Sequence, residues 1–94
     1  MRSLTARDVR CFVLDHFSAR ISDAGLAADD LGDHFDLLTE GIVDSLGVLD
    51  MIAAVQEHFA IDVDFEAMDP EHLTMLGPFS RFVAENATNG DSRG

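Results

Sequence analysis

The sequence contains a single cysteine, no lysine and no long apolar run. One cysteine excludes an internal disulfide framework. The apolar stretch at residues 11–14 is too short for the core of a signal peptide, and no run approaches the roughly 20 residues of a membrane helix. A hydrophobic content of 47% argues against disorder, and 94 residues provide for one core. We therefore expect a small cytoplasmic domain with no membrane insertion.

Without lysine, the basic residues are six arginines against 18 acidic residues, a net charge of −12. Residues 21–80 contain fourteen of the acidic residues and no basic one. Such a surface repels nucleic acid and acidic membranes and attracts basic protein surfaces. We therefore expect protein partners and no nucleic acid. Since net charge also keeps small domains apart, we expect a monomer.

Hydrophobic periodicity predicts an all-α fold, and its first helix spans residues 5–18. Thr5 can cap this helix, with Asp8 three residues later in a capping-box arrangement. An acidic segment with three glycines follows over residues 19–43. A connection of that length is unusual in a compact domain, so it is either functional or contains a short helix.

Two further long helices and one short one complete the prediction. A helix over residues 44–59 carries apolar side chains at a 3.6-residue period. A single helical turn is expected over 65–69, and a last helix over 74–86 has Thr74 as its cap and Pro78 in its first turn. Residues 87–94 have the composition of a disordered tail, which leaves 1–86 as the domain.

Motifs for catalysis and metal binding are incomplete. Residues 43–47 contain the end of a G-x-S-x-G nucleophile motif but lack its first glycine. Residues 62–73 resemble a calcium loop, with Ala67 at the glycine position and Leu73 at the glutamate position. One cysteine and four dispersed histidines lack zinc-site spacing. These histidines are His16, His34, His58 and His72. We therefore expect no enzyme and no metal site.

Ser45 stands where the acidic, glycine-containing segment turns into the second long helix. A hydroxyl there lies at the positive end of the helix dipole, where free N–H groups can support an attached phosphate. Asp44-Ser45 is equally an ordinary capping pair. Gly47, in the second turn, costs about 1 kcal/mol relative to alanine, so we expect a close approach at this position.

Residues 41–47, Gly-Ile-Val-Asp-Ser-Leu-Gly, resemble the phosphopantetheine attachment motif of acyl and peptidyl carrier proteins. The similarity extends over residues 35–83. It implies a small four-helix bundle of carrier-protein type, with three longer helices, one short helix and a long loop between the first two. Fatty-acid carriers usually have an acidic residue where this chain has Gly47, and residues 36–47 look closer to D-alanyl and stand-alone aminoacyl carrier proteins.

The resemblance implies that 4′-phosphopantetheine is attached covalently to Ser45, with Asp44 and Leu46 completing the motif. The thiol of this arm would hold an acyl or aminoacyl group as a thioester, in aminoacyl transfer or in polyketide or nonribosomal biosynthesis. The implied partners are a phosphopantetheinyl transferase, an acyl- or aminoacyl-loading ligase (an adenylating enzyme) and a downstream transferase or synthase. A helical wheel places the expected docking strip opposite the core face; it consists of Leu46, Asp50, Ala53 and Glu57.

Two alternatives remain open on the sequence. The first is an unmodified acidic helical adaptor that binds a basic protein, in which Ser45 only caps a helix. The second is a small hydrolase built on Ser45, which would need a histidine within hydrogen-bond reach of the serine.

Overall fold

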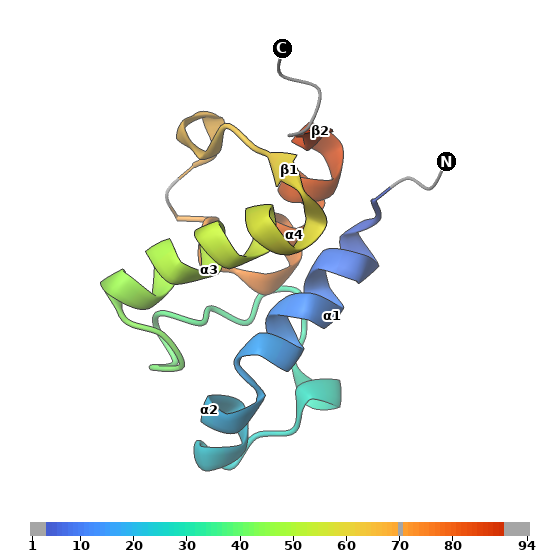
Figure 1. Cartoon of the computed structure of the whole chain (residues 1–94). Helices are drawn as coiled ribbons and strands as arrows, with labels where there is room; N and C mark the ends of the chain where they lie inside the picture. Colours follow the sequence, from blue (N-terminus) through green and yellow to red (C-terminus); the bar gives the residue numbers. More distant parts are fainter. Residues whose placement is uncertain (1–3, 70, 90–94) are drawn as a thin grey trace.

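The computed structural model describes residues 4–69 and 71–89 of the chain, which form a small, mostly helical bundle (Figure 1). This confirms the predicted helical class, with a two-stranded pairing in addition. None of the helices in the described ranges is long and apolar enough to cross a membrane. The elements in chain order are α1 (Ala6–His16), α2 (Ser18–Asp23), the 3-10 helix η1 (Ala28–Asp30), α3 (Ser45–Phe59), β1 (Ile61–Asp62), the 3-10 helix η2 (Phe65–Ala67), α4 (Leu76–Asn86) and β2 (Thr88–Asn89).

The first helix begins with the predicted capping box. The Thr5 hydroxyl accepts a 3.1 Å hydrogen bond from the Asp8 N–H, and an Asp8 carboxylate oxygen accepts one of 3.1 Å from the Thr5 N–H. The helix ends at His16, two residues earlier than predicted, and the chain turns at Phe17 into α2. The expected loop over 19–43 therefore begins with helix, which buried Ile21 holds against the core.

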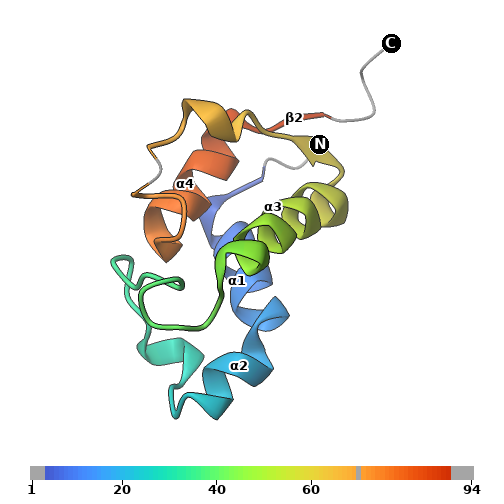
Figure 2. The ribbon, with the colours of Figure 1, turned by 90° about the vertical axis from the view of Figure 1, so that its left-hand side faces the viewer.

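The rest of this segment, residues 24–43, is called the connection below, and it is attached to the start of α4. The Leu37 N–H donates to the Thr74 carbonyl and the Leu76 N–H donates to the Phe35 carbonyl, both at 2.9 Å. In Figure 2 the connection passes beside the start of α4. A segment whose only helix is the short η1 is thus fixed by main-chain hydrogen bonds to a distant part of the chain.

The last helix begins at Leu76 and not at the predicted Thr74. The predicted cap is wrong because the buried Thr74 hydroxyl donates a 2.7 Å hydrogen bond to the carboxylate of Asp36 instead. Met75 occupies the cap position and makes no side-chain cap. Pro78 lies in the first turn, as predicted.

Asp33 connects α1, the connection and α4. Its carboxylate lies 3.1 Å from Arg10 of α1 and 3.3 Å from Arg81 of α4. Its carbonyl accepts a 2.9 Å hydrogen bond from the N–H of Gly77. A Cβ atom at Gly77 would lie only 2.5 Å from the Cβ of Asp33, so glycine is required for this contact.

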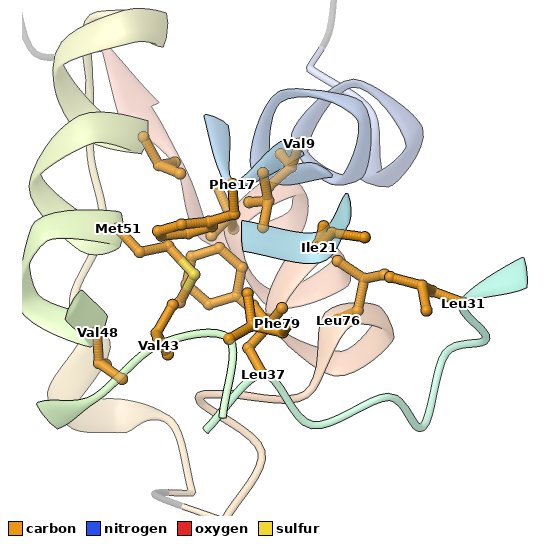
Figure 3. Packing of buried hydrophobic residues seen from close by; sticks show 14 of the residues in the cluster. Val9, Phe17, Ile21, Leu31, Leu37, Val43, Val48, Met51, Leu76 and Phe79 are labelled. Carbon is orange, nitrogen blue, oxygen red and sulfur yellow. The ribbon is translucent and has the colours of Figure 1, made fainter. Parts of the chain in front are cut away.

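The core lies between α1, α3 and α4, and the connection closes it. Figure 3 shows Met51 of α3 and Phe17 pointing into the same interior as Leu76 and Phe79 of α4. The other buried apolar side chains are Val9, Val13, Ile21, Leu31, Leu37, Ile42, Val43, Val48, Val55, Val63, Met68 and Val83.

The end of α4 is tied to the segment that follows α3. Ile61 pairs with Asn89 and Asp62 with Thr88 in an antiparallel register, and the Thr88 hydroxyl donates to the Asp62 carbonyl at 3.2 Å. Residues 88–89 thus form a strand where a disordered tail was predicted, and residues 90–94 of that tail lie outside the described residues. The start of α1 and β2 lie away from the start of α3 (Figure 1).

Candidate functional site

The first turn of α3 presents the predicted attachment residue. Asp44 is the N-cap, with extended backbone angles, and its Oδ1 accepts a 2.7 Å hydrogen bond from the N–H of Gly47. Ser45 is the first residue of the helix and is exposed. Asp44 therefore caps α3, and the serine is not needed for that purpose.

The hydroxyl of Ser45 is open to solvent. Within the described ranges no group forms a hydrogen bond with it. The N–H groups of the first helical turn have no intrahelical partners, so those that Asp44 does not bind can donate to oxygens of an attached group. An exposed, unbonded hydroxyl at this position fits the attachment of a phosphate ester.

Gly47 marks a close approach, as predicted. A Cβ atom there would lie 2.9 Å from the Cβ of Val43 and 3.3 Å from Oδ1 of Asp44. The absence of a side chain therefore lets buried Val43 pack onto the first turn of α3. The approaching group belongs to the chain itself, and it fixes the loop from which Ser45 emerges.

Hydrogen bonds to Leu37 hold that loop. The Leu37 carbonyl accepts from the N–H groups of Ile42 at 2.9 Å and Val43 at 3.2 Å. Gly41 has a φ of +79°, a left-handed conformation that glycine adopts at little cost. Ile42 and Val43 then point into the core and Ser45 stays outside. The serine thus sits on a fixed support.

Asp36 is a further fixed point of the loop. Burial by itself would raise the pKa of this carboxyl, but hydrogen bonds from Thr39, Thr74 and Leu38 outweigh burial, so the pKa lies below its ordinary value of 3.8. The Leu38 and Thr39 N–H groups donate to Oδ1 at 3.0 and 3.1 Å. Asp36 is therefore charged at neutral pH and holds the turn that begins the loop.

The comparisons leave the family open. No family model, curated protein or solved structure matches the chain. The resemblance to carrier proteins therefore rests on the sequence of residues 35–83, with the motif at 41–47, and stays a prediction.

The predicted docking strip lies on the outer face of α3. Leu46 is 75% exposed, and Asp50, Ala53 and Glu57 are also exposed. Leu49, which the predicted strip did not include, is 63% exposed and adds a second large apolar side chain. It stands three residues after Leu46, a spacing that could have identified it as part of the same face.

Asp50 also contacts α1. Its Oδ2 lies 3.2 Å from Nε2 of His16. The rings of His16 and His58 both stack on Phe12, at centroid distances of 5.6 and 4.3 Å. One carboxylate of the docking strip thus lies at the seam between α1 and α3, a contact that the sequence did not predict.

None of the four histidines reaches Ser45. His16 and His58 lie at the α1–α3 seam, while His34 and His72 line a shallow hollow beside α4 with Met68, Met75 and Phe82. Across the part of the chain that the structure describes, no histidine hydrogen-bonds to the serine and no group of three metal-ligating side chains occurs. Within the described residues, therefore, the histidine that the hydrolase alternative requires is not in contact with Ser45.

Proposed function

We propose that this chain is a monomeric cytoplasmic carrier protein, with a bundle of carrier type, that is modified on Ser45 by 4′-phosphopantetheine. In the attachment step the Ser45 oxygen bonds to the phosphorus of coenzyme A that bears the pantetheine. The nucleotide half leaves, and the transferase removes the hydroxyl proton. The bound arm supplies a thiol that carries an acyl or aminoacyl group as a thioester.

The observation that carries this proposal is the division of roles between Asp44 and Ser45. Asp44 caps α3, while the serine hydroxyl is exposed and makes no hydrogen bond within the described ranges. A serine that only capped the helix would have its oxygen occupied by a backbone N–H. A free hydroxyl on a fixed helix start supports its use as an attachment point.

The surface beside Ser45 supports transient docking to the partner enzymes. Leu46 and Leu49 provide apolar contact area next to the carboxylates of Asp50 and Glu57. Long-range attraction to basic partners gives fast encounter without a large buried interface. We propose that the transferase, the loading ligase and the downstream transferase or synthase dock here.

Intact-mass spectrometry tests the proposal directly. The folded chain is incubated with coenzyme A, magnesium and a broad-specificity phosphopantetheinyl transferase, beside Ser45→Ala and Ser18→Ala variants. We expect one added phosphopantetheine on the parent and on Ser18→Ala, whose serine is exposed at the start of another helix, and none on Ser45→Ala. No addition to the folded parent by any of several transferases would contradict the proposal.

The exposed leucines also favour the alternative of an unmodified adaptor, because Leu46 and Leu49 offer a docking surface whether or not Ser45 is modified. The Ser45→Ala variant separates the two functions. A carrier loses its function and keeps its docking, whereas an adaptor retains both. Leu46→Ala should weaken docking in either case.

A further inference from the structure

Arg20 is a basic side chain that folding brings to the loop of Ser45. Residues 21–80 contain no lysine or arginine, so the sequence around the serine is uniformly acidic. Arg20 lies on α2, where Nη1 donates to the Ile42 carbonyl at 3.4 Å. Its guanidinium carbon lies 5.7 Å from the centre of the Phe17 ring. Both ribbon views place α2 beside the loop that enters α3 (Figures 1 and 2).

This guanidinium is not neutralised by a carboxylate. Arg10 and Arg81 both form ion pairs with Asp33, whereas Arg20 forms none with any residue in the ranges the structure describes. One of its five N–H donors binds the Ile42 carbonyl, which leaves donors for another acceptor. In a chain with a net charge of −12, an arginine without an acidic partner is available for an added anion.

Arg20 binds the chain shortly before Ser45, which brings its charge to the loop that enters α3. Ile42 precedes Ser45 by three residues, a span of at most roughly 11 Å when fully extended. Charges within about 10 Å interact appreciably at 0.1 M salt. A long, exposed arginine side chain can also shift toward the serine by releasing one main-chain carbonyl.

We propose that Arg20 is the counter-charge for a phosphate attached to Ser45. Its guanidinium exchanges the Ile42 carbonyl for phosphate oxygens, an acceptor that it binds more strongly because the new hydrogen bonds join opposite charges. Arg20 thereby offsets the cost of adding an anion to an acidic surface and restrains the root of the arm. The nature of the group rests on the proposed function, whereas the interaction itself depends only on a phosphate at this position.

The test uses the full chain with phosphoserine at position 45, made by ligation, so neither coenzyme A nor a transferase is involved. The second pKa of the phosphate is followed by phosphorus NMR in the parent, Arg20→Gln and Arg7→Gln. Arg7 is another exposed arginine, on α1, whose start lies away from the start of α3 (Figure 1). Both substitutions remove one positive charge, so the difference in phosphate pKa between the two variants measures the effect of where that charge lies.

We expect the second acid dissociation constant of the phosphate to be about two- to tenfold smaller in Arg20→Gln than in Arg7→Gln, because a nearby cation favours the dianion. Salt of about 1 M, where the Debye length is ~3 Å, should remove most of this difference. Equal acidity in the two variants would overturn the proposal and leave Arg20 as a clamp on the loop. If Arg20→Gln does not fold, the Nε–H signal of Arg20 in the unsubstituted chain decides: it must shift as the phosphate ionises, and an unchanged signal overturns the proposal.

The two proposals fail separately. Modification of Ser45 by a transferase together with no effect of Arg20 would leave the carrier function standing without this counter-charge. An Arg20 effect on phosphoserine in a chain that no transferase modifies would contradict the carrier function and preserve a phosphate-binding site at the start of α3.

Discussion

The N–H of Gly47 donates a 2.7 Å hydrogen bond to Oδ1 of Asp44, while the Ser45 side chain between them points away into solvent. Either residue could have capped the helix, because aspartate and serine are both good caps. The choice of Asp44 leaves the serine oxygen free for chemistry. Stability measurements can therefore separate the capping residue from its exposed neighbour.

Asp44→Ala should lower the free energy of unfolding by about 1 kcal/mol, the usual cost of losing a cap. Ser45→Ala should change it by less than about 0.5 kcal/mol, as is typical of an exposed position without such a contact. Urea denaturation followed by circular dichroism measures both. An equal loss in the two variants would show that the serine shares the capping.

Gly47→Ala should destabilise the protein by about 1–3 kcal/mol despite the better helix propensity of alanine. The new methyl group would lie 2.9 Å from the Cβ of Val43, an atom attached directly to the backbone. Gly32→Ala is the matched control, because nothing lies within 4 Å of its added Cβ. If thermal melts show both variants equally stable, the loop accommodates the added methyl group without loss of stability, which would contradict the steric argument.

Gly77→Ala should be more damaging than Gly47→Ala. The added atom would lie 2.5 Å from the Cβ and 2.9 Å from the Cα of Asp33, so the backbone of the connection would have to move. Asp33→Asn keeps this shape and removes only two exposed ion pairs, which should cost no more than about 1 kcal/mol. Comparable denaturation midpoints for Gly77→Ala and Asp33→Asn would contradict the steric argument.

Asp36 should make the stability pH-dependent at the acidic end. Its pKa in the fold lies below its ordinary value of 3.8, so the carboxylate stabilises the fold above that pH. This contribution is lost as the pH falls through the lowered pKa. The stability difference between the parent and Asp36→Asn should therefore be largest near neutral pH and shrink below about pH 4.

Urea midpoints measured from about pH 7 to pH 3 check this dependence. Asp23→Asn, at an exposed position at the end of α2, corrects for the change in net charge. A difference between the parent and Asp36→Asn that stays constant with pH, or grows toward acid, would contradict the assignment.

Sequence-local features were predictable. The capping box of Thr5 and Asp8 and the outward face of α3 depend on residues three or four apart, and the structure has both. Leu49 was missed because the strip was drawn too narrowly, although its spacing from Leu46 gave the signal. Met51, buried to 1% exposure, was likewise missed, because the 3.6-residue pattern placed Val48, Ile52, Val55 and Phe59 on the core face.

Contacts between distant segments were not predictable. Thr74 is a good cap by residue type, but its hydroxyl binds Asp36, 38 residues away, so α4 begins later. The contact between Arg20 and the loop before Ser45 could not be predicted for the same reason. Arg20 reaches the Ser45 loop from α2, a short helix at the start of the segment for which the sequence left a functional loop or a short helix open.

The pairing of Ile61–Asp62 with Thr88–Asn89 has a practical consequence. It ties the end of α4 to the segment that follows α3, at the opposite end of that helix from Ser45. The start of α1 also lies away from the start of α3 (Figure 1). A bead, a fluorophore or a fusion partner attached before α1 or after β2 would then leave the first turn of α3 uncovered. The fold can therefore be immobilised or joined to another polypeptide while the Ser45 side chain stays exposed.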